Sequence, residues 1–402
     1  MKNNNKPHKL TRFLFSLSLI LIIFTVGYKI GEYKSQKLLF IPQSNNQKNI
    51  DFSLFWDAWQ KIEDKFVDKK KVDQQKMFYG AIKGMVASVD DPYTFFLTPD
   101  ENKQAKSDLE GKLEGIGAQL GLKEGRIVVI SPIKDSPADK AGVRASDFIN
   151  KVDEASTSNW TLSQAVSKIR GPKGTKVKLT IERGGKESDI VIIRDQIIID
   201  SVVLTFEKNI AVITVSQFGE NTNSEWDKAV LQIAKKWEDK EIKGLVLDLR
   251  GNPGGYLESS VYLASDFFPS GKLIVKQEST TYKNQNYISD KEGRLQKIPL
   301  TVLIDKGSAS ASEILSGSLR DYKRGVLVGE KSFGKGSVQE ALDLSKGAGL
   351  HVTIAKWILP NGDWINGKGI TPDIIIENKI KEGDTITPET DLQLQKAIEQ
   401  IK

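Results

Sequence analysis

The sequence contains no cysteine and only two histidines, His8 and His351, among its 402 residues. The absence of cysteine excludes disulfides, thiolate nucleophiles and cysteine-ligated zinc or iron–sulfur centres. Histidine is too scarce for any site that needs two or three imidazoles, such as the HExxH zinc site. The function must therefore rest on chemistry that needs neither thiols nor clustered imidazoles.

Most of the excess positive charge lies at the N-terminus, and little remains in the rest of the chain. The formal net charge is +6, but Lys2, Lys6, Lys9 and Arg12 precede the first acidic residue, so everything after them is nearly balanced. No basic stripe with interleaved aromatic residues follows, and we expect no nucleic-acid partner. A composition of 39% hydrophobic and 27% charged residues is typical of globular protein. This length predicts two or three folded units of roughly 100 to 200 residues each.

One long apolar run stands near the N-terminus, over residues 13–28, directly after the cationic stretch. This pattern is typical of a signal peptide or a membrane anchor, and the run is slightly short of the roughly 20 residues that span a bilayer. We favour the anchor, because no small-x-small cleavage site follows. Residues 1–31 are thus a signal peptide or anchor, and the polar residues 32–50 form a stalk.

The remaining chain divides by its hydrophobic periodicity. Residues 51–112 form a helical region with two helices, the second stopped by Asp90-Asp91-Pro92. Residues 113–195 form a compact β-rich module, and residues 196–376 alternate strands with helices, which predicts an α/β core with a largely parallel sheet. A C-terminal helical segment occupies residues 377–402.

The β-rich module contains a candidate peptide-binding site. Gly115-Ile116-Gly117-Ala118 precedes Leu120, and the glycines allow successive backbone N–H groups to surround a carboxylate. A helix over 161–169 presents Val166 and Ile169 to an apolar groove. With the segments SPA (136–138), AGV (141–143) and DFI (147–149), the module resembles a PDZ domain of bacterial proteases, which captures free C-termini by strand addition. The alternative is that the glycines only form a turn and the apolar residues only form the core.

A strand pattern over 299–305, a glycine at 307 and the run Ser308-Ala309-Ser310-Ala311-Ser312 together predict a serine at a helix N-terminus. Free N–H groups there can stabilise an oxyanion beside the hydroxyl. The serine needs a base. His351 is one candidate, although its alternating surroundings favour a half-buried strand histidine, and His8 lies across the membrane segment.

Lys335, between Gly334 and Gly336, is the other candidate base. Burial would lower the pKa of its ammonium group and allow it to accept a proton. Gln339 carries no charge and could orient the amine, since positions 335, 337 and 339 share one face of a strand. The alternative is a solvated lysine in a turn.

Two glycine-rich loops carry competing interpretations. Residues 251–255 (GNPGG) follow a buried strand at 245–249, and their N–H groups could add an oxyanion donor. Residues 329–335 match the phosphate-loop pattern GxxxxGK, but Gly336 stands where that motif needs Ser or Thr, and a β-like stretch follows instead of a helix. A nucleotide site is therefore not expected.

Taken together, the chain resembles the carboxy-terminal processing (tail-specific) peptidases, a family of PDZ-containing Ser/Lys proteases. The resemblance rests on LVLDLRGNPGG (245–255), KGSASASEI (306–314), VGEKSFGKGSVQ (328–339) and NGKGITPD (366–373). It implies that Ser310 is the nucleophile, that Lys335 is the base and that Gln339 positions the lysine. The oxyanion hole would then be Ala311 with either Gly254 or Gly255, while Ser308, Ser312, Glu313 and Asp321 would be structural.

The same resemblance implies an α/β protease core with a β-rich PDZ domain inserted after an N-terminal helical region. The reaction would be cleavage near the exposed, largely apolar C-terminus of a protein substrate, without metal or cofactor, on the outer side of a bacterial membrane. Arg170 would couple PDZ occupancy to activity. The helices at 55–59 and 392–398 are candidate homodimer surfaces. The alternatives are a membrane-tethered PDZ scaffold with an inactive protease domain, and an amidase or esterase that uses His351.

Overall fold

A computed structural model describes residues 50–133, 135–378, 387 and 389–401. The chain divides into two compact units, Met1–Met77 and Phe78–Lys402. Among the described residues no helix is both long and apolar enough to cross a membrane. The predicted membrane segment, residues 13–28, and the stalk up to residue 49 lie outside the described residues.

The first unit is helical, as its periodicity predicts. It contains α2 (Ser53–Lys65), a short 3-10 turn (Lys69–Lys71) and the start of α3 (Gln74–Ala87). No residue of α2 is buried, and Phe52, Phe55 and Trp56 are exposed. The aromatic face expected to serve as a dimer surface is therefore uncovered within this unit.

The second unit is built around a six-stranded sheet in which all strands after the first pair run parallel. In spatial order it contains β10 (Val202–Glu207), β11 (Ile210–Val215), β12 (Gly244–Asp248), β15 (Leu300–Ile304), β16 (Val326–Gly329) and β19 (Ile374–Ile375). Every residue of β12 and β15 is buried, because helices cover both faces of a parallel sheet. The predicted parallel α/β core is confirmed.

Alternate residues of these strands face two separate cores. Leu245 and Leu247 join the larger apolar cluster, with residues of α7 (Thr222–Glu238), α8 (Leu257–Ser265) and α9 (Ala311–Asp321). Val246 joins the smaller cluster, with Leu394 and Ala397 of α10 (Leu392–Glu399). The apolar residues of the C-terminal helix are thus used for internal packing, which weakens its case as a dimer surface.

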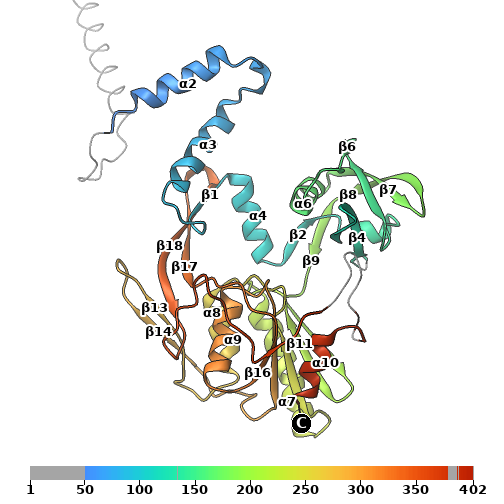
Figure 1. Cartoon of the computed structure of the whole chain (residues 1–402), viewed down its shortest axis with the longest axis vertical. Helices are drawn as coiled ribbons and strands as arrows, with labels where there is room; N and C mark the ends of the chain where they lie inside the picture. Colours follow the sequence, from blue (N-terminus) through green and yellow to red (C-terminus); the bar gives the residue numbers. More distant parts are fainter. Residues whose placement is uncertain (1–49, 134, 379–386, 388, 402) are drawn as a thin grey trace, which may run out of the picture. The chain divides into compact units, whose positions relative to one another are not determined.

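A second sheet was not expected from the sequence. Its order is β1 (Phe95–Leu97), β18 (Gly349–Ile358), β13 (Leu273–Glu278) and β14 (Gln285–Ile288), and β17 (Ser337–Asp343) also pairs with β18. β17 and β18 form a long hairpin beside β1 (Figure 1). This sheet brings the segment before residue 97 next to the strands that follow Lys335.

The β-rich module folds around its own core, as predicted. Its sheet order is β3 (Ala118–Lys123), β4 (Arg126–Pro132), β5 (Phe148–Val152), β7 (Lys176–Arg183) and β8 (Lys186–Ile193), with β6 (Ala155–Ser156) beside β5. The helices α5 (Pro137–Lys140) and α6 (Leu162–Ile169) complete it. The module is linked by β2 (Lys112–Gly115), which pairs with β9 (Asp195–Ile198), and α4 (Pro99–Leu109) precedes β2.

Candidate active site

Ser310 lies at the junction of strand β15 and helix α9, at the position that caps the helix. Its backbone is in the sparsely populated region at φ 54° and ψ −113°. Such a conformation costs a residue with a Cβ about 1 to 3 kcal/mol and is common at functional sites. Ser310 is half-buried. Its side chain faces the Glu313 backbone N–H in a capping box, and among the described residues its hydroxyl donates a hydrogen bond to no acceptor.

The neighbouring serines differ, because both are buried and both hydroxyls are occupied. Ser308 donates to the Leu249 carbonyl at 2.8 Å and Ser312 donates to the Asn252 carbonyl at 2.9 Å. These contacts fix the serine turn to the end of β12 and to the GNPGG loop. Of the three serines in the run, Ser310 alone has a hydroxyl that donates to no acceptor within the described structure.

The GNPGG loop packs directly against Ser310. Asn252 is fully buried; its amide donates to the Val215 carbonyl at 2.7 Å, and its side-chain oxygen accepts the Gly254 N–H at 2.8 Å. A Cβ on Gly254, at φ +102°, would lie 2.8 Å from the Ser310 Cβ and 3.0 Å from the Ala311 nitrogen. Only glycine fits there. The N–H groups of Ala311 and Gly255 have no acceptor among the described residues, whereas that of Gly254 is occupied.

Glu313, one turn into α9, joins the serine turn to the lysine loop. One carboxylate oxygen accepts the N–H groups of Ser310 and Lys335, each at 2.9 Å. The other accepts the Ser332 hydroxyl at 2.5 Å and the Gly334 N–H at 2.7 Å. Burial raises the pKa of this carboxyl, against the hydrogen bonds that lower it. Residues 310 and 335, 25 positions apart in sequence, are thus held to a single oxygen atom.

Lys335 is half-buried, not a solvated turn residue. Burial lowers the pKa of its ammonium group from the ordinary value of 10.5, although the Asp91 and Glu313 carboxylates oppose this shift. Its Nζ lies 5.1 Å from the centre of the Tyr93 ring. No hydrogen bond between Lys335 Nζ and Ser310 Oγ is present in the described structure, and it is the backbones of the two residues that Glu313 joins.

Gln339 does not contact Lys335 in the described structure. Its Nε2 donates to the hydroxyl oxygens of Ser337 at 2.8 Å and Thr353 at 3.1 Å. The role of Gln339 in positioning the lysine therefore stays a prediction. Its side chain belongs to a polar network between β17 and β18.

The structure also places the alternative base, His351, and the alternative phosphate-loop motif at 329–335. His351 lies on β18 opposite Phe95, and the two rings stack at 4.6 Å. Burial and the nearby Lys335 lower the pKa of this histidine. It is the half-buried strand residue that the sequence indicates. The segment after Lys335 continues as β17, so the GxxxxGK pattern opens no helix and lacks the N-terminal N–H groups of a phosphate loop.

The predicted peptide-binding residues lie around the edge strand of the β-rich module. Ala118 and Leu120 are half-buried on β3, which pairs only with β4 among the described strands, and Val166 is half-buried on α6, which contacts β3. Ile116 and Ile169 are buried in the module core. Gly115 ends β2, and Gly117 has φ +73° with the Ser136 Cβ 2.5 Å from where its own would be.

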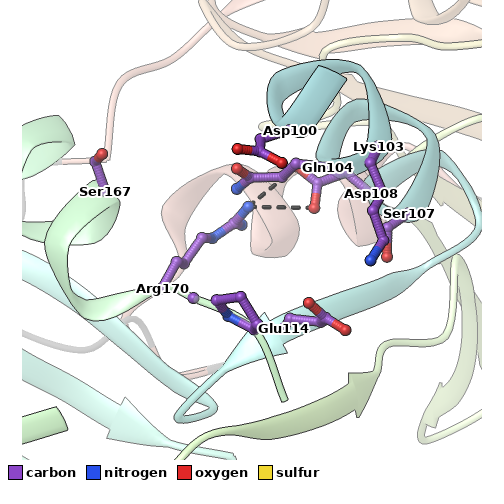
Figure 2. A pocket seen from close by; sticks show the side chains of 10 residues that line it. Asp100, Lys103, Gln104, Ser107, Asp108, Glu114, Ser167 and Arg170 are labelled. Carbon is purple, nitrogen blue, oxygen red and sulfur yellow. Dashed lines mark hydrogen bonds and ion pairs between the residues drawn. The ribbon is translucent and has the colours of Figure 1, made fainter. Parts of the chain in front are cut away.

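Arg170 ends α6 and forms an ion pair with Asp108 of α4 at 3.0 Å. The pair lies in a pocket of about 300 Å³, lined by α4 residues on one side and by the residues after α6 on the other (Figure 2). Among the described residues, Arg170 contacts neither Ser310, Lys335 nor Gln339. Its contact is with the helix that joins the β-rich module to β1.

Three residues near the lysine were missed by sequence reasoning. Asp91, interpreted only as part of a helix stop, and Tyr93, given no role, face Lys335, and Thr353 links Asp91 to Gln339. Asp91 and Tyr93 precede Lys335 by about 240 residues, and Thr353 lies on strand β18. Only the pairing of β1 with β18 brings them together, and no short-range pattern records that pairing.

Three segments of the chain match known protein families. Residues 209–376 match the model of peptidase family S41, residues 115–193 match a PDZ domain, and residues 26–101 match the N-terminal domain of the activating protease CtpB. The chain is 37% identical over 360 residues to the carboxy-terminal processing protease CtpB of Bacillus subtilis (strain 168), covering 87% of this chain and 74% of that protein.

A second relative and a solved structure extend this similarity. The carboxy-terminal-processing protease of Bartonella bacilliformis (strain ATCC 35685 / KC583 / Herrer 020/F12,63) is 37% identical over 372 residues, with 90% of this chain and 83% of that protein covered. Among solved structures, the photosystem II D1 C-terminal processing protease is 28% identical, with a TM-score of 0.55, covering 87% of this chain and 98% of that one.

Proposed function

Because the chain belongs to peptidase family S41, among the carboxy-terminal processing serine proteases, we propose that Ser310 and Lys335 form its catalytic dyad. The observation that carries this proposal is the Glu313 carboxylate, one oxygen of which accepts the backbone N–H of both residues. It is supported by the Ser310 hydroxyl, which donates to no described acceptor, by the strained backbone of Ser310, and by the half-buried amine of Lys335.

In the proposed reaction, Ser310 Oγ attacks the carbonyl carbon of the scissile peptide while neutral Lys335 Nζ takes the hydroxyl proton. The resulting ammonium gives that proton to the leaving amine as the C–N bond breaks, which leaves an acyl-serine ester. Water then attacks the ester, Lys335 takes a proton from the water, and Ser310 recovers its proton as the acid product leaves. Ala311 and Gly255 have the unoccupied N–H groups suited to the developing oxyanion, and Gly254 provides the close approach.

Gln339 is assigned the role of orienting the lysine. Its Nε2 is occupied by two hydroxyl oxygens, and its Oε1 accepts no hydrogen bond among the described residues. That oxygen can accept a hydrogen bond from Lys335 once the amine turns toward the serine. Because an amide cannot become charged, it can hold the lysine without fixing its proton.

The dyad is tested by variants assayed on an unfolded protein with an apolar C-terminus. We expect Ser310→Ala and Lys335→Ala each to abolish cleavage near the C-terminus, with Ser308→Ala as the matched serine control for the first variant. His351→Gln should retain cleavage. Retained cleavage in Lys335→Ala with loss in His351→Gln would establish a Ser/His amidase instead. No cleavage by the parent protein would favour the PDZ scaffold.

We further propose that the PDZ domain captures the substrate tail along edge strand β3, with α6 on the other side. Two features support this: β3 has one strand partner among the described residues, and Ala118, Leu120 and Val166 are not fully buried. Tail capture would gate activity through Arg170 and its ion pair with Asp108. An Arg170→Ala variant that is as responsive to a tail peptide as the parent would contradict this gating role.

Location and partners complete the proposal. The apolar run at 13–28, with its cationic flank, supports a protease on the extracytoplasmic face of the bacterial cell membrane. It would be held there by a single-pass anchor, or exported if the run is cleaved. Substrates would be proteins with exposed, largely apolar C-termini. The uncovered aromatic residues of α2 support a homodimer, and sedimentation of a Trp56→Glu variant against the parent would test it.

A further inference from the structure

The loop over residues 91–94 is held tightly on strand β18. The Asp91 carboxylate accepts the hydroxyl of Thr94 at 2.6 Å, the hydroxyl of Thr353 at 2.5 Å and the Tyr93 N–H at 3.2 Å. The Thr94 oxygen in turn accepts the Thr353 N–H at 3.1 Å. With β1 paired to β18 directly after it, the loop is fixed at both ends.

This loop faces the amine of Lys335. Four groups that titrate surround that amine from the elements packed against it: Asp91 and Tyr93 on the loop, Glu313 on α9 and His351 on β18. The hydroxyl and N–H donors hold the pKa of Asp91 below its ordinary value although burial opposes them, so Asp91 is ionised at neutral pH. The ring of Tyr93 lies 5.1 Å from Nζ, within the range of a cation–π contact.

The loop is also connected to Gln339. Gln339 Nε2 donates to the Thr353 hydroxyl oxygen, and the Thr353 hydroxyl donates to Asp91. One chain of hydrogen bonds therefore runs from the carboxylate to the amide assigned to orient the lysine. A change at Asp91 would therefore alter both the stability of the Lys335 ammonium and the position of its side chain.

We propose that the loop 91–94 is a positioning element for the Lys335 base, in which the Asp91 carboxylate and the Tyr93 ring stabilise the ammonium that forms when Lys335 accepts the Ser310 proton. The inference rests on the proposed Ser/Lys dyad and adds to it. No atom of the loop takes part in bond making or breaking.

The amine of Lys335 must meet two opposing requirements. Before the reaction the amine must be neutral, which burial achieves by disfavouring the charged form. During the attack the same amine becomes an ammonium in the same dry site, and burial alone would make it too weak a base. A fixed carboxylate and an aromatic face lower the cost of that new charge and need no rearrangement at the moment of reaction.

The test compares the variants Asp91→Asn and Asp91→Glu. Asp90→Asn is the matched control, because Asp90 is exposed and is not among the carboxylates that act on the lysine. The measurement is the pH profile of kcat/KM, in a His351→Gln background so that no imidazole beside the lysine titrates. Neutral Lys335 is the active form, so activity rises with pH through its pKa. Removing the negative charge should move this rise by about one pH unit toward acid, as for the loss of a nearby opposite charge.

The plateau at high pH should also fall in Asp91→Asn, by about tenfold, because a base of lower pKa is less effective. Asparagine keeps an oxygen for the two threonine hydroxyls and loses only the long 3.2 Å contact with the Tyr93 N–H, so a purely structural role would leave it close to the parent and would harm Asp91→Glu more. The electrostatic role predicts the opposite order, with Asp91→Glu keeping the pH profile of the parent more closely. Asp90→Asn should match the parent.

A second pair of variants does not depend on the stability of Asp91→Asn. Tyr93→Phe keeps the ring over the amine and should retain the profile, whereas Tyr93→Leu should lower the plateau and move the rise toward acid. Unchanged profiles in Asp91→Asn and Tyr93→Leu, with Lys335→Ala inactive, overturn this inference and leave the dyad standing. Full activity of Lys335→Ala overturns the dyad itself.

Discussion

Replacement of Glu313 by glutamine would test whether one buried carboxylate holds the active site together. The change is isosteric but turns one of two acceptor oxygens into a donor. Glu313 accepts three backbone N–H groups and one hydroxyl, and the hydroxyl of Ser332 also accepts the Ile370 N–H at 2.6 Å. Whichever way the amide turns, at least one buried N–H faces another donor.

The cheaper orientation places the amide nitrogen toward Ser332 and Gly334, because a hydroxyl can rotate to accept. That leaves the Gly334 N–H without an acceptor, at a cost of about 1 to 3 kcal/mol of folding free energy. The other orientation leaves the N–H groups of Ser310 and Lys335 unpaired and costs about twice as much by the same rule. We therefore expect Glu313→Gln to unfold at a lower urea concentration than the parent.

The effect on catalysis should exceed the effect on stability. Loss of the carboxylate removes a group that raises the pKa of Lys335 and frees the loop that carries it. We expect kcat/KM to fall by roughly a hundredfold, the size found when a preorganised catalytic group is lost. Glu238→Gln, at the exposed end of α7, is the matched control and should change stability by less than about 0.5 kcal/mol. A Glu313→Gln protein with parental urea midpoint and parental kcat/KM would refute the reasoning.

Two further predictions concern the GNPGG loop and Arg250, which directly precedes it. Gly254→Ala places a Cβ against Ser310 and Ala311 and should lower kcat/KM by roughly a hundredfold. Gly251→Ala is the control and should keep the activity, because its Cβ would meet no atom within 4 Å. Equal activities of the two variants would show that the close approach at Gly254 does not matter. Arg250→Met leaves the buried carboxylates of Asp248 and Asp391 without their cation and should destabilise the fold by about 3 to 5 kcal/mol in urea unfolding. The exposed pair of Lys396 and Glu399 provides the contrast, because Lys396→Met should cost less than about 1 kcal/mol.

Much of the fold could be predicted from local patterns. Strands β11, β12 and β15 are near-continuous apolar runs of the length and composition that buried parallel strands require, and helices α7 and α9 lie between them in the alternation that the sequence predicts. The sheet of β1, β13, β14, β17 and β18 was not predicted as a unit. Its strands pair antiparallel across distant parts of the chain, and the register of β1 with β18 depends on a separation of more than 250 residues.

The candidate site shows the same division. The run 308–312 placed a serine at a helix start, and the glycines around residue 335 marked the lysine, because both are local consequences of residue type. Tertiary contacts decided which serine hydroxyl remains without an acceptor, since Ser308 and Ser312 donate to the carbonyls of Leu249, just after β12, and of Asn252 in the GNPGG loop.

Residue type and spacing are enough to predict the parts: a parallel core, a β-rich module resembling a PDZ domain, a serine at a helix N-terminus and a lysine between glycines. How these parts meet depends on long-range contacts. Glu313 joins the serine turn to the lysine loop, and Asp91 and Tyr93 reach the lysine through the pairing of β1 with β18. The reason is that residue type and spacing set local conformation, whereas burial and the electrostatic environment of an amine depend on every segment that folds around it.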